Sequence, residues 1–262
     1  MIGVMLFMIV GGIGLAQAVS HPHQVTLGWL RLGGIIAVSL LVLAVAFGVW
    51  TGAVWPIFWL GLGLTAAAMM TQLITVQLAM RTIQRLAACI AFVVAASSSA
   101  WTLLELAMPQ PLEQPWGMIL SQVLLSAPLS SGLLGGFLMT MLLGHAYLTA
   151  GGAMTQTPFL RLVRVLAMLL GLRIAASLLF GLSPHWRVQI GSGYDRSWLT
   201  MMITARYAVG LAVPLVFIYM VYDCVRRRSN QSATGILYVT TVLVVIGEGL
   251  AMALFGSTGR VF

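Results

Sequence analysis

The chain has 262 residues, of which 60% are hydrophobic and 7% are charged, and its mean hydropathy is +1.03. Soluble domains carry about 25% charged residues, so this composition excludes a soluble enzyme and indicates a protein whose main solvent is lipid. The net charge of +8 comes from thirteen arginines against five acids. Because these arginines are scattered singly or in short groups, the charge does not indicate a nucleic-acid partner.

Runs of about 20 apolar residues, the length that spans a bilayer core, predict eight transmembrane helices. The first run has no positively charged region before it, so we interpret it as a retained helix and not as a signal peptide. The sequence therefore predicts an all-α, polytopic integral membrane bundle that forms a single transmembrane domain. The approximate cores of the helices are 1–19, 32–50, 54–76, 85–107, 117–148, 159–182, 198–225 and 232–256.

The two halves of this predicted bundle differ in charge. Residues 1–110 form four helices whose interiors are almost free of charge, and we assign them to docking or anchoring. Residues 111–262 form four helices that carry the ionisable groups. The fifth helix is too long for a perpendicular crossing and contains Pro128, which removes a backbone donor. We expect a kink or a break there, with a short outer segment before the true span.

The distribution of arginines predicts the orientation, because cytoplasmic loops accumulate positive charge. With eight helices, eight arginines fall on one side and three on the other, so we expect both termini on the outer face. The eight are Arg31, Arg81, Arg85, Arg161, Arg164, Arg226, Arg227 and Arg228, and the three are Arg187, Arg196 and Arg260. The longest external connection, Ser183–Trp198, is then a candidate lid.

Three ionisable residues within the predicted spans are the most informative, because charge at the bilayer centre costs at least about 2.5–3.5 kcal/mol. Measured from the cytoplasmic helix ends at about 1.5 Å per residue, Arg173 lies at about 21 Å, Glu248 at about 24 Å and Arg206 at about 28 Å. We therefore expect Glu248 to bridge the two guanidinium groups in one outer-leaflet layer. Such a layer is either a pocket for a carboxylate, a haem propionate or a quinone oxygen, or a clamp that locks helix packing.

Further candidate ligand-binding residues are Tyr207, which follows Arg206, and the pair His145 and Tyr147 near the cytoplasmic end of the fifth helix. His145 can hydrogen-bond a quinone headgroup or relay a proton. The sequence contains no recognisable catalytic motif and no metal-ligand spacing, so we assign no catalytic or metal-binding residue. The sequence does not identify a cofactor; a quinone is one candidate, and a haem held mainly by a partner subunit is less favoured.

These features favour a non-catalytic integral subunit of a larger assembly in a bacterial inner membrane. The most plausible assembly is an electron-transfer complex of the respiratory or photosynthetic type, with other membrane subunits as partners. The alternative is a small transporter that binds an anionic solute at Arg173, Arg206 and Glu248. In both cases we expect anionic lipid headgroups at the short basic run Arg226, Arg227 and Arg228.

Overall fold

The computed structural model describes the whole chain except residues 22, 53–55, 108–115, 150–154, 182–195 and 259–262. The described residues are all α-helical apart from turns, and eight helices are each long and apolar enough to cross a membrane, which confirms the predicted polytopic fold. The elements are α1 (Ile2–Val19), α2 (Leu27–Trp50), α3 (Pro56–Gln77), α4 (Arg81–Ala107), α5 (Trp116–Thr149), α6 (Thr157–Gly181), α7 (Arg196–Tyr207), the π-helical turn η1 (Ala208–Ala212), α8 (Val213–Arg226) and α9 (Asn230–Thr258).

The seventh span is composite, because α7, η1 and α8 follow one another without a loop and together form the span Ser197–Arg226.

The turns that follow α3 and α8 are very tight. Ala79 after α3 and Arg228 after α8 have positive φ angles of 57° and 60°. In each turn a backbone N–H bonds back five residues, from Met80 to Thr75 and from Ser229 to Cys224. These are the left-handed helix caps that let the next helix start at once.

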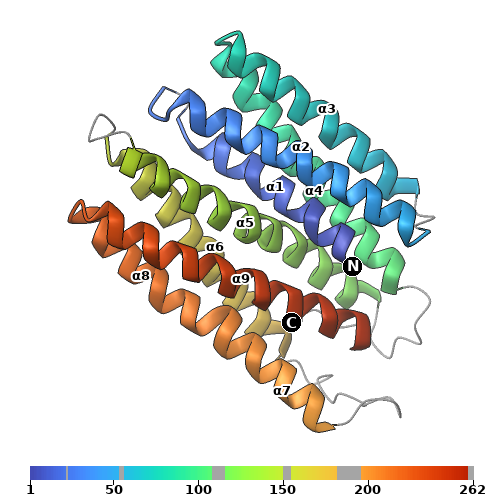
Figure 1. Cartoon of the computed structure of the whole chain (residues 1–262). Helices are drawn as coiled ribbons and strands as arrows, with labels where there is room; N and C mark the ends of the chain where they lie inside the picture. The colour runs from blue at the N-terminus through green and yellow to red at the C-terminus, as the bar shows by residue number, and fades with distance from the viewer. Residues whose placement is uncertain (22, 53–55, 108–115, 150–154, 182–195, 259–262) are drawn as a thin grey trace.

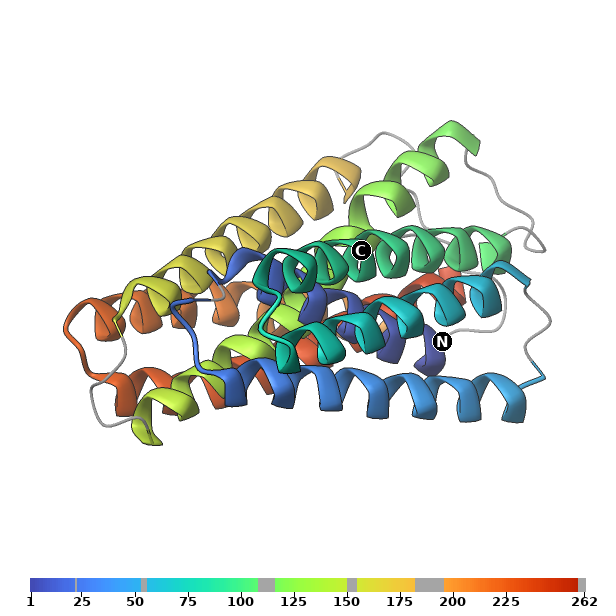
Figure 2. The ribbon, with the colours of Figure 1, turned by 90° about the horizontal axis from the view of Figure 1, so that it is seen from above.

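Helix α5 lies between the two halves of the bundle, with α1 on one side and α9 on the other (Figure 1). Helix α1 also contacts α2 and α4, and α3 packs on α4. In the second half α8 contacts both α6 and α9, while α7 contacts α9. Seen from above in Figure 2, the helices form one continuous assembly. The core therefore runs from the first half into the second through α5.

Glycines bring α1 and α5 into backbone contact. A Cβ atom on Gly135 would overlap the backbone of Ile9, Gly12 and Ile13. Close approach at small residues is the usual way for membrane helices to gain packing energy, because lipid leaves little hydrophobic force between them. The indole Nε1 of Trp29 on α2 donates a hydrogen bond of 3.0 Å to the carbonyl of Met139 on α5. Both contacts join the low-charge helices to α5.

Helix α5 continues through Pro128 for 34 residues. The sequence predicted a kink or a break at this position, and the structure contains no break. A span of this length measures about 51 Å, well beyond an apolar core of about 30 Å. A proline is tolerated inside a membrane helix where neighbouring helices and hydroxyl side chains surround the freed backbone group.

The eight arginines of the predicted cytoplasmic side lie near helix ends, at the end of the bundle opposite the start of α1 and the end of α9 (Figure 1). The sidedness itself stays a prediction. In a variant with Cys89 and Cys224 replaced by serine, we expect Ser229→Cys, in the exposed turn after α8, to react with a membrane-impermeant maleimide only from the cytoplasmic side. Thr51→Cys, in the exposed turn after α2, should react only from the outer side. The reverse pattern would invert the topology.

The backbone contact of α1 and α5 predicts a strong position dependence of glycine substitution. Gly135→Ala should lower the free energy of unfolding by about 1–3 kcal/mol, because the backbone of α1 must move away. Gly171→Ala is the matched control, since a Cβ atom on Gly171 meets nothing within 4 Å. Thermal unfolding in detergent measures both, and equal melting temperatures would argue against the contact.

Candidate functional site

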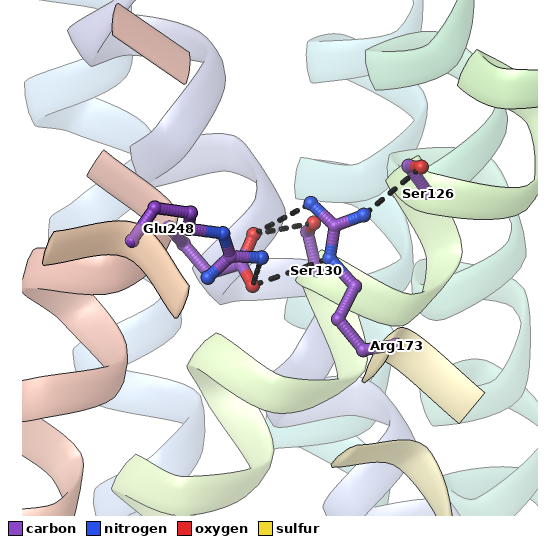
Figure 3. Close-up of polar contacts among 5 residues, drawn as sticks. Ser126, Ser130, Arg173 and Glu248 are labelled. Carbon is purple, nitrogen blue, oxygen red and sulfur yellow. Dashed lines mark hydrogen bonds and ion pairs between the residues drawn. The ribbon is translucent and has the colours of Figure 1, made fainter. Parts of the chain in front are cut away.

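The candidate site is a buried cluster of charged and hydroxyl side chains from four helices (Figure 3). Arg173 comes from α6, Arg206 from α7 and Glu248 from α9, while α5 contributes Ser126 and Ser130. The three ionisable residues are only 1%, 0% and 2% exposed, respectively. In the membrane these charges are shielded from lipid by the helices around them.

Glu248 bridges the two arginines, as its predicted depth indicated. Nη2 of Arg206 lies 3.0 Å from Oε1 of Glu248. Arg173 approaches the same carboxylate with two nitrogens, Nη2 at 3.4 Å from Oε2 and Nε at 3.4 Å from Oε1. The predicted contact of the three residues is therefore confirmed.

Two serines of α5 complete the cluster. Ser130 Oγ donates a hydrogen bond of 2.7 Å to Oε2 of Glu248, and Nη1 of Arg173 donates one of 3.0 Å to Ser126 Oγ. The sequence interpretation did not include these serines in the site. The available signal was their spacing of four residues, which places both on one face of α5.

The surroundings of Arg206 are unusual because backbone encloses its guanidinium group. Gly210 in η1 and Gly247 in α9 approach each other so closely that a Cβ atom on Gly210 would lie 2.6 Å from Cα of Gly247. Nη1 of Arg206 lies beside this contact, 3.1 Å from where either Cβ would be. Among the described residues, Nε and Nη1 of Arg206 have no hydrogen-bond partner.

The π-helical turn η1 starts two residues after Arg206. Its defining bond runs from the N–H of Val213 to the carbonyl of Ala208, five residues back. Pro214, which has no N–H, follows directly as the second residue of α8. Such π-turns are rare and are often found at functional sites. Here the turn lets Gly210 face Gly247 and so shapes the space around the Arg206 guanidinium.

The described charged groups of this cluster carry one positive charge in excess, since a single carboxylate serves two guanidinium groups. A cavity of about 20 Å³ adjoins Arg173 and Glu248, and its lining does not include Arg206. It has room for about one water molecule or a small ion. Its lining is Met8, Leu103, Ser126, Ala127, Ser130, Arg173, Glu248, Ala251, Met252 and Phe255. The arrangement can therefore accept an anion or a hydrogen-bond-accepting oxygen.

The other predicted site residues fall into two groups. Tyr207 lies next to the cluster, but its hydroxyl donates to the backbone carbonyl of Ser177 on α6 at 3.3 Å. His145 and Tyr147 lie far from the cluster, about 22 Å and about 26 Å along α5 from Ser130 at the helical rise of about 1.5 Å per residue. The side chain of His145 is exposed. Tyr147 is buried and its hydroxyl donates to the carbonyl of Thr155.

Two further expectations concern a metal and the lid. The described part of the chain holds no group of three or more histidine, cysteine, aspartate or glutamate side chains that could bind a metal ion. The predicted lid, Ser183–Trp198, falls outside the described residues over 183–195.

Comparisons with protein-family models, with curated proteins and with solved structures give no match for this chain.

Removing the carboxylate of Glu248 should destabilise the protein. Glu248→Gln should lower the free energy of unfolding by about 3–5 kcal/mol, because it removes the negative charge that two buried guanidinium groups share. Asp223→Asn is the matched control, since Asp223 forms an exposed ion pair with Arg227, and such surface pairs contribute about 1 kcal/mol or less. Thermal unfolding of the detergent-solubilised protein measures the difference. A Glu248→Gln melting temperature equal to that of the control would contradict the bridging role.

Proposed function

We propose that the cluster of Arg173, Arg206 and Glu248 binds an anionic or carbonyl-bearing ligand within the membrane. The observation that carries this proposal is the state of Arg206, which is fully buried and pairs with Glu248 through Nη2 alone among the described residues. Arginine keeps its charge when buried and offers five N–H donors. Nε and Nη1 are therefore donors that a ligand oxygen or a small anion would satisfy.

The protein is proposed to act as a non-catalytic integral subunit of a larger assembly in a bacterial inner membrane, most plausibly an electron-transfer complex. A quinone suits such a site because its carbonyl oxygen accepts hydrogen bonds from a guanidinium group. The adjoining cavity of about 20 Å³ is much smaller than a quinone ring, so a quinone would present its oxygen from the edge of the site. Other membrane subunits are the partners in this proposal.

The second candidate function is a small transporter of an anionic solute. The observation that favours it is the irregular helix beside Arg206, where η1 and Pro214 interrupt the regular α-helical bonding of the seventh span. Broken or irregular helices at a binding site allow transporters to open and close access to it. The excess positive charge of the described cluster suits an anionic solute equally well.

The decisive variant is Arg206→Met, because it removes one of the two cations that share Glu248 and leaves the ion pair of Arg173 with Glu248. We expect this variant to keep or exceed the wild-type melting temperature without ligand, since it removes two unpaired buried donors. It should also lose the rise in melting temperature that decylubiquinone or a small carboxylate such as acetate produces in the wild type. Arg31→Met, at an exposed arginine of α2, is the matched control and should respond as the wild type does.

Two outcomes would contradict ligand binding at the cluster. One is a wild-type protein that neither probe stabilises, and the other is an Arg206→Met variant that both probes stabilise as strongly as the wild type. Two experiments discriminate between the complex subunit and the transporter: purification in mild detergent, and solute uptake into liposomes. Stable co-purifying subunits with bound quinone support the subunit, whereas anion uptake by the isolated chain that is lost in Arg206→Met supports the transporter.

A further inference from the structure

Two arginines from different helices lie beside one aromatic ring at the end of the bundle opposite the start of α1 and the end of α9. The guanidinium carbons of Arg164 on α6 and Arg226 on α8 each lie 5.8 Å from the ring centre of Tyr222. Cation–π attraction to the ring holds each guanidinium group in place. The ring thus gathers two like charges at the junction of α6 and α8.

The nearby acid does not neutralise this pair. Asp223 is the one acidic residue that the described chain has at this end, and its carboxylate lies 2.9 Å from Nε of Arg227. For Arg164 and Arg226 the described part of the chain shows no ion pair with an acid. Both side chains are exposed, so an external anion has access to them.

A groove of about 460 Å³ continues from Arg164 along one face of α6. Its polar part is formed by Arg161 and Arg164, which are three residues apart and so share a helix face. Its apolar part is formed by Leu160, Val165 and Met168. From Thr157 to Met168 the groove extends about 16 Å along the helix, from the end of the bundle into its apolar depth.

This order of groups, cations at the helix end and apolar side chains further in, matches one kind of molecule. An anionic phospholipid has a phosphate at the membrane surface and an acyl chain directed toward the bilayer centre. Arginine binds phosphate oxygens through two parallel N–H bonds, and basic residues at the membrane surface attract anionic lipids. We propose that Arg161, Arg164 and Arg226 bind the phosphate of an anionic phospholipid whose acyl chain lies along Leu160, Val165 and Met168.

This site is independent of the proposed function, since it lies at the end of the bundle and shares no residue with the Glu248 cluster. The arginines of the basic run at the end of α8 therefore differ in their roles. Arg226 belongs to the site, whereas Arg227 is engaged by Asp223.

The test uses the purified full chain with phosphatidylglycerol or phosphatidylcholine added, and native mass spectrometry to measure the lipid bound. We expect phosphatidylglycerol to bind at least tenfold more tightly than phosphatidylcholine. The double variant Arg164→Gln, Arg226→Gln should lose that preference, and Tyr222→Leu should weaken it. The matched control Arg227→Gln, which removes one charge from the same end of the bundle, should retain it.

Thermal unfolding without added lipid should give similar melting temperatures for the arginine variants, because the replaced arginines are exposed. Inorganic phosphate at millimolar concentration distinguishes a lipid from a free anion. Phosphate should not displace bound phosphatidylglycerol, and displacement would overturn the role of the acyl groove. An unchanged lipid preference in the double variant, or an equal loss in Arg227→Gln, would also overturn the site.

Discussion

One carboxylate, that of Glu248, holds together the polar interior of the second half of the bundle. It joins α6 and α7 through Arg173 and Arg206, and α5 through the hydroxyl of Ser130. In an apolar solvent neither arginine can be left without a counter-charge or hydrogen-bond acceptors. The positions of α5, α6, α7 and α9 around this point therefore depend on one another. Among the described residues, this one carboxylate is shared by two cations, so their charges sum to one positive charge.

Much of this arrangement follows from the sequence. Apolar runs predicted all eight spans, because the thickness of a bilayer fixes the length of helix that crosses it. The contact among Arg173, Arg206 and Glu248 followed from their depths. Ionisable side chains at the same depth of a small bundle pair with one another, because lipid offers them no partner. Scarcity of charge made the inference possible, because few ionisable side chains had to be placed.

Other features did not follow from the sequence, for identifiable reasons. Serines in membrane helices commonly bond to their own backbone, so the four-residue spacing of Ser126 and Ser130 did not by itself mark them as cluster residues. The π-turn lies where Gly210 packs against Gly247, and Gly247 belongs to another helix, so the local sequence does not show this contact. Pro128 predicted a kink or a break, but α5 is one continuous helix through this residue. A membrane helix can contain a proline where neighbouring helices surround the freed backbone group. His145 and Tyr147 were included for their chemistry, but their place along α5 sets them apart from the charged cluster.

The backbone contact of α1 with α5 has a consequence for the order in which the chain is assembled. Gly135 is synthesised about 120 residues after Gly12, which at ordinary elongation rates corresponds to a delay of roughly 6–25 s. During that interval α1 resides in the membrane without the neighbour that fits it most closely, and α2 and α4 are the partners it meets first. The surface of α1 that packs on α5 in the final structure therefore lacks this partner until α5 is inserted. Assembly of this protein is therefore a matter of timing during synthesis as well as of the final contacts.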